Sequence, residues 1–412
     1  MSTKWTCNAN EATCLRLAGA PSPSDALFHP EFTYPIFGEA EAIYGYNGLH
    51  MNLAFASGSL VPSLEITYRA KNTTTSAKVD DVEQALRGVL PPDVVTPAEL
   101  DAIVARDAQG GPGAFTPPGT KIATYTRARP KSKSWFWSNS STPREYAIFH
   151  ASWDTPGFQA WLKRAQIFTL FFIEGASYVD TAEKNWEFYT VFERTDGPSG
   201  DVWHFVGYTS LYRFWCWPKN TRVRLSQFFI LPPYQRQRHG SELYGTVYKC
   251  LLEDASVCEL TVEDPSESFD GLRDTCDLQY LSAQGASVTA HLGPPVDATW
   301  SAQARTTYKL APRQWARVLE MLGLLHLNPD EPEQLRAYRQ QIKKRIYNVN
   351  REVLAMLEPE ERVAKLHETF VSVVDEYAEI TGVELPEALL EVPPYRKRSI
   401  DSSDAPRKAR KL

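Results

Sequence analysis

The chain has 412 residues, of which 43% are hydrophobic and 23% are charged, and its formal net charge is −6. This composition is that of soluble globular proteins and excludes the fibrous and wholly disordered classes, while the length predicts two or three domains. No apolar run approaches the ~20 residues that a membrane span needs, and the six cysteines include no C-x-x-C pair, so we expect no membrane segment, disulfide framework or zinc site.

The first segment, residues 1–149, is predicted to be an α+β domain. Apolar runs of strand length alternate with two segments of helical periodicity. The strands are expected at residues 42–46, 49–56, 64–70 and 122–125, and the helices at residues 80–90 and 97–107. Glycine and proline clusters between residues 109 and 119 predict a loop, and residues 132–143 predict a surface insertion.

Residues 150–311 are predicted to form a second domain. It begins with a helix over residues 158–176, whose dense apolar residues predict burial on several sides. Two aromatic strands follow at residues 186–193 and 202–217. The period of two in the second strand places every second side chain, Tyr212 among them, on one face of a sheet.

The most informative stretch is residues 223–264. Residues 223–231 are apolar, β-branched and aromatic, and they end at two prolines, as a strand does. A helix is expected from Ser241 to about residue 254, because apolar residues recur four apart on one face. A second strand over residues 257–263 ends at another proline. Strand, helix and strand are predicted to form one βαβ unit.

The loop of this unit, residues 234–240, precedes the N-terminus of its helix. A helix N-terminus presents unpaired N–H groups and the positive end of the helix dipole, so the loop is expected to bind an anion such as a pyrophosphate. Ligands of open α/β sheets lie beyond the carboxyl ends of parallel strands, which is where Glu263 and Asp264 stand. An anion site and a carboxylate base are therefore expected in one cleft.

Residues 312–382 are predicted to be helical, and residues 383–412 are predicted to be a disordered basic tail. Apolar residues of helical spacing mark three helices between prolines, and the pattern of the second extends to Leu357. The tail carries two basic clusters, at residues 396–398 and 407–411, which predict a bipartite nuclear-import signal; a merely solvating tail is the alternative. The last 20 residues contain seven basic and two acidic residues, which leaves a net charge of −11 on the rest of the chain.

The loop residues carry a resemblance to a known superfamily. Gln235-Arg236-Gln237-Arg238-His239-Gly240 is similar to the Q-x-x-G-x-G/A loop of the GNAT acetyltransferases, which wraps the pyrophosphate of acetyl-CoA. Longer strings resemble one family within it, the type B histone acetyltransferases, and they cover residues 28–33, 37–39, 44–46, 48–49, 172–174, 176–177, 206–208, 226–235, 261–266 and 272–274. This ordered set spans most of the chain and makes the resemblance specific.

The resemblance implies an α+β fold in four parts. A GNAT-like acetyltransferase domain with a mixed sheet would be preceded by an α+β N-terminal domain and followed by a helical C-terminal region. The parts would be a substrate-binding domain at residues 1–149, the acetyltransferase domain at 150–311, the helical domain at 312–382 and the disordered basic tail at 383–412.

One residue departs from the superfamily pattern. Arg238 stands where the loop has its first glycine. An arginine in the left-handed backbone region costs roughly 1–2 kcal/mol. Its guanidinium could pair with a phosphate and offset that cost, so the detailed loop contacts depend on this position.

The resemblance further implies transfer of acetyl from acetyl-CoA to N-terminal tail lysines of newly synthesised histone four. A lysine with a pKa of ~10.4 is protonated near pH ~7, so a carboxylate must remove its proton before the amine attacks the thioester. We expect Glu263 to be the principal base, with Glu174 and Asp264 in support, although an exposed residue at the end of its helix is an equal alternative for Glu174. Because the amine can attack directly once it is aligned, no covalent enzyme intermediate is expected, and no metal is expected.

The remaining site residues are assigned by their match to the family. The backbone of Phe229, Ile230 and Leu231 would contact the pantetheine arm and the carbonyl. The pyrophosphate would be held by Arg236, Gln237, Arg238, His239, Gly240 and Ser241, with Ser268 as a further cofactor contact. His239 is expected to start the helix or adjoin the phosphate rather than bind a metal.

The family match also assigns the residues that would bind the histone. Glu39 and Glu41 would contact the basic tail, although two solvated loop carboxylates fit the sequence equally well. Trp186 and Tyr212 would line the groove for the aliphatic stem of the target lysine. The alternative is that both side chains only pack in the hydrophobic core.

The expected partners are the histone four tail and a WD40 histone chaperone subunit of the RbAp type. The acidic body suits a basic substrate and argues against direct nucleic-acid binding. The first twenty residues lack the apolar core of a signal peptide, so we expect the protein in the cytoplasm and nucleus. Two other functions remain open: an acetyltransferase of the superfamily that acts on another amine, and a histone-binding chaperone subunit without catalysis.

Overall fold

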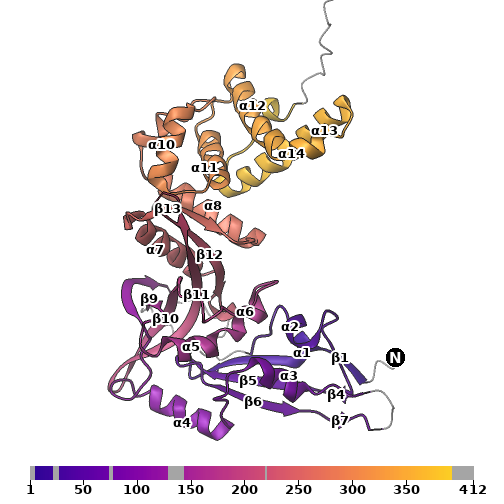
Figure 1. Ribbon diagram of the computed structural model, residues 1–412, viewed down its shortest axis with the longest axis vertical. Helices are drawn as coiled ribbons and strands as arrows, with labels where there is room; N and C mark the ends of the chain where they lie inside the picture. The colour runs from indigo at the N-terminus through magenta and orange to yellow at the C-terminus, as the bar shows by residue number, and fades with distance from the viewer. Residues whose placement is uncertain (1–4, 22–26, 74–77, 129–142, 219, 392–412) are drawn as a thin grey trace, which may run out of the picture. The chain divides into compact units, whose positions relative to one another are not determined.

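The computed structural model describes residues 5–21, 27–73, 78–128, 143–218 and 220–391 (Figure 1). It divides into two compact units, one with residues 1–272 and 308–311 and the other with residues 273–307 and 312–412. The predicted nuclear-import signal and nearly all of the predicted insertion lie outside the described residues.

Small sheets form the N-terminal part of the first unit. The largest has the order β2 (Thr13–Ala18), β5 (His50–Ala56) and β6 (Pro62–Thr67), with β2 parallel and β6 antiparallel to β5. Two further pairs join β1 (Thr6–Asn8) to β3 (Ala42–Tyr44) and β4 (Tyr46–Asn47) to β7 (Ala70–Lys71). The helices are α1 (Ala9–Ala12), α2 (Tyr34–Phe37), α3 (Val82–Val89) and α4 (Pro97–Asp107).

Helix α4 has the bounds that the sequence predicts. Thr96 precedes it, and its hydroxyl accepts the Glu99 N–H at 3.4 Å while the Glu99 carboxylate accepts the Thr96 N–H at 2.8 Å. This reciprocal capping satisfies two of the amides that a helix start leaves unpaired. The helix buries Leu100 against Ala18 and Ala56, so a local signal and a core contact specify the same start.

A six-stranded mixed sheet forms the rest of the first unit. Its order is β13 (Val257–Val262), β12 (Asn220–Ile230), β11 (Gly200–Cys216), β10 (Trp186–Gly197), β9 (Arg144–Ser152) and β8 (Thr120–Arg127). All neighbours are antiparallel except β12 and β13. The chain leaves β12 through a 3₁₀ turn, η2 (Pro232–Tyr234), returns along α7 (His239–Glu253) and enters β13 parallel to β12. The predicted βαβ unit is therefore confirmed.

Aromatic side chains join the sheet to α5 (Phe158–Ala165) and α6 (Ile167–Phe172), which lie beside it (Figure 1). The ring centroids of Phe158 and Phe188 are 4.8 Å apart, and those of Phe168 and Phe229 are 6.3 Å apart. Each of these rings is buried. Such tilted aromatic pairs add about 0.5–1.5 kcal/mol each beyond the burial of their area.

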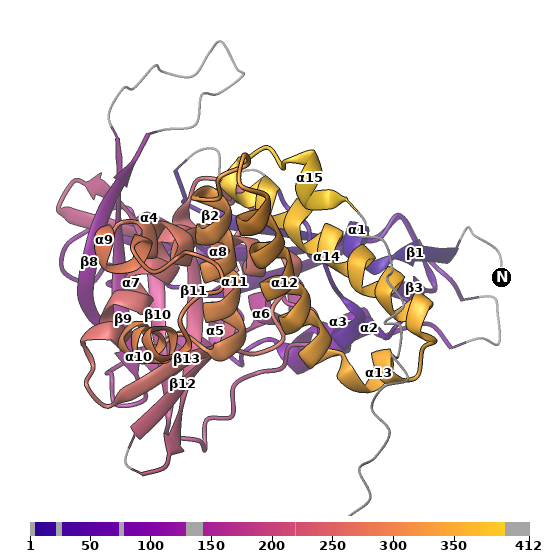
Figure 2. The same cartoon turned by 90° about the horizontal axis from the view of Figure 1, so that it is seen from above.

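Helices make up the second unit. Helix α8 (Glu267–Ser282) begins in the first unit and continues into the second. The others are α9 (Ala286–Thr289), α10 (Ala298–Tyr308), α11 (Pro312–Leu325), α12 (Pro332–Val349), α13 (Arg351–Ala355), α14 (Pro359–Thr381) and α15 (Glu387–Leu390). Figure 2 shows α11, α12 and α14 alongside one another. The predicted fold class, a GNAT-like mixed sheet with an α+β N-terminal part and a helical C-terminal region, is confirmed.

Two predicted helices are wrong in extent. The helix expected over residues 158–176 is divided at Gln166, whose buried carboxamide accepts the Val179 N–H at 2.7 Å, and it ends at Phe172. The second C-terminal helix ends at Val349 rather than Leu357, because the backbone leaves the helical conformation at Asn350. Apolar spacing continues across both breaks, so it does not reveal them.

The structure divides the chain at places other than the predicted boundaries. The boundary between residues 149 and 150 falls inside β9, and β8 belongs to the same sheet as the βαβ unit. Helix α10 and most of α8 belong to the second unit, and the sequence did not predict them. Both helices have weak apolar periodicity, which explains why spacing failed there.

A buried histidine in the first unit predicts a loss of stability in acid. His204 is 3% exposed, with Nδ1 2.8 Å from Ser57 Oγ and Nε2 2.9 Å from Thr195 Oγ1. Burial, helped by Arg144, lowers the pKa of His204 to about 4. In the unfolded chain His204 binds a proton near pH ~6.5. The folding stability that depends on neutral His204 is therefore fully present above that pH and is lost as the pH falls toward 4.

Urea titrations at pH 7 and pH 4.5 check this expectation. Between these pH values the free energy of unfolding of the unaltered chain should fall by about 2 kcal/mol more than that of His204→Gln. His50→Gln, at an exposed position, is the control and should behave like the unaltered chain. Equal losses for His204→Gln and the unaltered chain would contradict the assignment.

Candidate functional site

The parallel strands β12 and β13 separate half-way along β12. Their ladder runs from Thr221 to Leu225 on β12, and the next bond joins the Glu263 N–H to the Leu225 carbonyl at 2.9 Å. The pairing of β12 with β11 shifts at the same point and leaves Ser226 without a partner residue in that ladder. Residues 226–230 therefore form an edge to which no described residue of β13 pairs. Such an edge can accept an extended ligand as an added strand.

The residues predicted to contact the pantetheine arm lie on or next to this edge. Phe229 and Ile230 end β12, Leu231 follows it, and all three are buried. The Leu231 N–H donates to the Val206 carbonyl at 2.9 Å, and the Ile230 carbonyl accepts Gln235 Nε2 at 2.9 Å. Since these two groups serve the fold, a ligand on the edge would use other backbone groups of the strand.

The loop after β12 presents free amides at the start of α7. The N–H groups of residues 236–241 have no acceptor among the described residues. The loop is shaped from within, because Gln237 Nε2 donates to the Pro233 carbonyl at 3.0 Å. Free amides at the start of a 15-residue helix form the arrangement that binds anions.

Two arginines of this loop occupy the left-handed backbone region. Arg238 has φ 66° and ψ 17°, as its place in the glycine position of the pattern suggests, and Arg236 has φ 59°. Each costs roughly 1–2 kcal/mol relative to an ordinary conformation. The loop must therefore be held by contacts that offset this strain.

His239 is the first residue of α7 and lies in the core. It is 1% exposed, and Nδ1 is 2.9 Å from the Tyr125 hydroxyl. Burial, with Arg127 and Arg144 nearby, lowers the pKa of His239 to about 4. The imidazole is therefore neutral near pH ~7 and acts as a helix-start and packing residue.

The start of α8 packs against the loop and the strand edge. A Cβ on Gly240 would lie 2.7 Å from Leu272 Cδ1, so a larger residue there would require the Leu272 side chain to move. The Phe269 ring meets the Phe228 ring edge-on at 5.0 Å. Ser268, in the first turn of α8, is exposed beside these contacts, which places it near the predicted cofactor loop.

The Glu263 carboxylate is held by two residues of β12. Its Oε2 accepts the Ser226 hydroxyl at 2.5 Å, and its Oε1 lies 3.3 Å from Arg224 Nη2. The Glu263 side chain is 37% exposed, so a substrate can reach it. Asp264, the next residue, is exposed and has φ 34°. The structure thus holds one of the two adjacent carboxylates and leaves the other in solvent.

Gln227 links the loop that carries Glu174 to the same part of β12. Glu174 is exposed and follows α6 rather than lying in a helix. Gln227 Nε2 donates to the Ser177 carbonyl at 2.8 Å, and its Oε1 accepts the Tyr208 hydroxyl at 2.6 Å. Because Gln227 follows Ser226, the loops of Glu174 and Glu263 are bonded to neighbouring residues of one strand.

Trp186 and Tyr212 stand in one row across the sheet. They are cross-strand partners, with ring centroids 4.9 Å apart at 76°, and Tyr212 is in register with Arg224 on β12. The Tyr212 hydroxyl donates to Glu183 Oε2 at 2.9 Å. Since Arg224 also contacts Glu263, the row leads from the two aromatic rings to the carboxylate.

The predicted tail-binding carboxylates differ in their surroundings. Glu41 Oε1 accepts the Thr33 and Tyr34 N–H groups at 2.6 and 3.1 Å, and its Oε2 accepts Asn10 Nδ2 at 2.8 Å. Glu41 therefore caps the short helix α2, a structural role that the sequence did not suggest. Glu39 is exposed and remains the better placed of the two for a basic ligand.

Comparison with known proteins supplies the family. A family model described as the histone acetyl transferase HAT1 N-terminus matches residues 5–174, and one described as fungal HAT1, C-terminal, matches residues 274–328. The chain is 47% identical to a histone acetyltransferase type B catalytic subunit of Mycosarcoma maydis, over 94% of this chain and 91% of that one. The chain belongs to the type B histone acetyltransferase catalytic subunit family.

Other members of this family are also similar to this chain over most of its length. Subunits of the same description from Cryptococcus neoformans and Eremothecium gossypii are 40% and 34% identical, over 92% and 97% of this chain and 98% and 95% of theirs. A solved aminoglycoside acetyltransferase from a soil metagenome matches at 13% identity over 34% of this chain and 87% of its own, with a TM-score of 0.23. That score is too low to support a comparison of folds.

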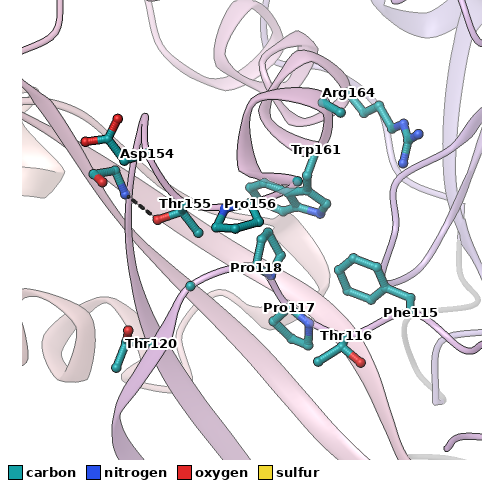
Figure 3. Close-up of a pocket in the computed structure, with 14 residues that line it drawn as sticks. Phe115, Thr116, Pro117, Pro118, Thr120, Asp154, Thr155, Pro156, Trp161 and Arg164 are labelled. Carbon is teal, nitrogen blue, oxygen red and sulfur yellow. Dashed lines mark hydrogen bonds between the residues drawn. The ribbon is translucent and has the colours of Figure 1, made fainter. Parts of the chain in front are cut away.

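Figure 3 shows residues that line a pocket of about 800 Å³ in the first unit. The loop of residues 115–120 forms one wall, and the turn before α5 with Trp161 and Arg164 forms another. None of the site residues inferred from the family resemblance lines it.

Within the described ranges no helix is long and apolar enough to cross a membrane, and no group of His, Cys, Asp and Glu is arranged to hold a metal.

Several residues that shape the candidate site were missed in the sequence. Ser226 and Gln227 lie within a string that resembles the family, but nothing in the string shows that one bonds Glu263 and the other bonds the Glu174 loop. Arg224 resembles any strand arginine. A further contact, from Arg127 to the loop at Gln237, joins residues 110 positions apart, which no local pattern can indicate.

Proposed function

We propose that this protein transfers the acetyl group of acetyl-CoA to lysines in the N-terminal tail of newly synthesised histone four. The observation that carries the proposal is the position of Glu263. Its carboxylate stands at the point where β12 and β13 separate and at the end of the row that contains Trp186 and Tyr212. An acyl donor on the strand edge and a lysine along the row would meet beside it.

The residues of the edge and loop fit acetyl-CoA. The pantetheine arm is extended and carries amides, so it can pair with the edge at residues 226–230 as a strand would. The free amides of residues 236–241 and the positive end of the α7 dipole suit the pyrophosphate. Arg236 and Arg238 add positive charge to the same loop. When bound, acetyl-CoA supplies the thioester that the amine attacks.

Glu263 is the proposed base. The target lysine arrives protonated, and only its neutral amine attacks the thioester. The Ser226 hydroxyl and the Arg224 guanidinium fix the orientation of the carboxylate, so that it can take the proton directly or through one water. Glu174 and Asp264, both exposed, are proposed to support this step by adding negative charge that attracts the ammonium group.

The aromatic row is proposed to select a lysine side chain. Trp186 and Tyr212 offer ring faces to the aliphatic stem, while Glu183, bonded to the Tyr212 hydroxyl, adds a carboxylate at the same place. Apolar stems and charged heads are commonly bound in this way. The charge of −11 on the chain without its last 20 residues favours a basic peptide over a neutral one.

We extend the proposal to the expected partner and location. A WD40 histone chaperone of the RbAp type would present the histone, and the enzyme would work in the cytoplasm and the nucleus. The resemblance to the family supports both statements, and the basic clusters of the tail, residues 396–398 and 407–411, support nuclear entry.

Acetyl transfer to three acceptors tests the function. We expect a histone-four tail peptide to be acetylated with a kcat/KM at least 100-fold above that for spermidine, and the same peptide with every lysine replaced by arginine to be inert. Release of CoA and the mass of the peptide are the measurements. Comparable rates with spermidine would favour an acetyltransferase for other amines. No transfer to any acceptor, from folded protein that carries the WD40 subunit, would leave the histone-binding chaperone.

A further inference from the structure

We propose that Arg127 is a positioning residue for acetyl-CoA, which holds the cofactor loop from the far edge of the sheet and neutralises a carboxylate beside the anion site. This inference rests on the proposed function, because it assumes that the loop binds the pyrophosphate. Arg127 is the last residue of β8, the edge strand opposite β13 in the order of the sheet. Figure 2 shows β8 beside α7.

The Arg127 guanidinium bonds to the loop and the helix at once. Its Nε donates to the Gln237 carbonyl at 3.1 Å, and its Nη2 donates to Glu242 Oε1 at 2.5 Å. A third bond, from Nη1 to the Thr126 carbonyl at 3.1 Å, fixes the guanidinium to its own strand. The guanidinium also lies 5.1 Å from the centre of the Tyr125 ring, so four contacts set its position.

The bond to Gln237 orients the amide that follows it. The peptide unit is planar and trans, so its carbonyl and its N–H point in opposite directions. Arg127 holds the Gln237 carbonyl on the β8 side, and the N–H of Arg238 therefore points to the other side. This N–H belongs to the run of free amides at residues 236–241.

The same bond opposes the strain in the loop. Gln237 stands between Arg236 and Arg238, both in the left-handed region with φ 59° and 66°. Without a contact on the central peptide the loop would relax toward ordinary conformations. Arg127 supplies that contact, which keeps the amides directed at the ligand before the ligand arrives.

The bond to Glu242 removes an unfavourable charge. Glu242 lies in the first turn of α7, where a carboxylate stabilises the helix itself but repels an anion bound at the same end. The guanidinium pairs with this carboxylate through a side chain that is only 24% exposed, and so screens it from the pyrophosphate. Arg127 thereby acts on the cofactor through the loop backbone and through Glu242.

Calorimetric binding of acetyl-CoA and steady-state kinetics test the proposal. Arg127→Ala is expected to weaken acetyl-CoA binding by 10-fold or more, while kcat at saturating acetyl-CoA changes by less than 3-fold. Arg127→Lys keeps the charge but cannot bond both acceptors with one planar group. Its affinity for acetyl-CoA should therefore lie between those of Arg127→Ala and the unaltered chain. In the Arg127→Ala background, Glu242→Gln should restore part of the lost affinity. Arg87→Ala, at an exposed arginine paired with Glu83, should bind like the unaltered chain.

S-acetyl-pantetheine separates positioning of the phosphate loop from a general effect on the fold. This donor lacks the pyrophosphate, so its KM should be the same for Arg127→Ala and the unaltered enzyme. Unchanged acetyl-CoA affinity in Arg127→Ala, or equal weakening of both donors, would overturn the proposal. If the alanine variant does not fold, the lysine variant decides by the same comparison. If the protein is a chaperone without catalysis, the unaltered chain will not bind acetyl-CoA. If it acetylates another amine, the unaltered chain will still bind acetyl-CoA and the comparison of variants stands, so failure of the proposed function is distinguishable from failure of this proposal.

Discussion

Replacing Glu263 with glutamine is expected to lower kcat for acetylation of a histone-four tail peptide by roughly 10²-fold or more. Glutamine keeps the size of the side chain and can still accept the Ser226 hydroxyl, but it cannot take a proton from the substrate amine. The affinity for acetyl-CoA should stay within a factor of about three, because Glu263 lies beside the strand edge and outside the loop of residues 236–241 that presents the free amides. Single-turnover kinetics and calorimetry measure the two quantities separately.

The pH dependence of the variant provides the sharper test. If Glu263 is the base, Glu263→Gln must rely on lysine that has lost its proton to solvent, so its rate should rise tenfold per pH unit up to the lysine pKa of ~10.4. The unaltered enzyme should reach its plateau at much lower pH. Parallel pH profiles for the two proteins would show that another group removes the proton.

A matched control guards against a mere change of charge. Glu267→Gln makes the same chemical change at an exposed carboxylate in the first turn of α8, four residues along the chain. Its kcat should stay within a factor of two of the unaltered enzyme. If both variants lose activity equally, the local negative charge rather than a positioned base is responsible.

The sequence predicted the parts of the fold that local patterns encode. The prolines after β12 and the apolar spacing of α7 gave the βαβ unit, and the helical periodicity of residues 97–107 gave α4. The division of the helix at Gln166 was not predicted, because the apolar spacing continues across it. Helix α10 was missed because its apolar residues lack a clear face.

In the candidate site, too, short stretches of sequence marked some residues, whereas contacts between residues far apart in the chain could not be predicted. Family strings marked Glu263, Trp186 and the loop, but the contacts that orient them come from residues far along the chain. Ser226 reaches Glu263 across the strand opening, and Arg127 reaches the loop from β8. Whether the marked residues bind what the resemblance implies stays a prediction until the variants are measured.

The second large effect is expected from Asp274 in the helical unit. This carboxylate is 1% exposed, and its Oδ2 accepts Arg317 Nη2 at 2.5 Å and Nε at 3.1 Å. Its Oδ1 accepts Gln314 Nε2 at 2.8 Å. Asp274→Ala removes every one of these bonds and leaves the Arg317 guanidinium, itself 90% buried by its side chain, without its innermost partner.

We expect Asp274→Ala to lower the free energy of unfolding of this unit by about 3–5 kcal/mol, because it leaves the buried Arg317 charge with only the partly exposed Glu376 as a charged partner among the described residues. Glu376→Ala is the matched control. It removes the other carboxylate that contacts Arg317, at 2.6 Å, but Glu376 is 45% exposed, so water can replace it at a cost of at most about 1 kcal/mol. Urea unfolding followed by far-ultraviolet circular dichroism compares the two. Similar losses for both variants would mean that solvent reaches the Arg317 guanidinium and that Asp274 does not anchor α8 to α11.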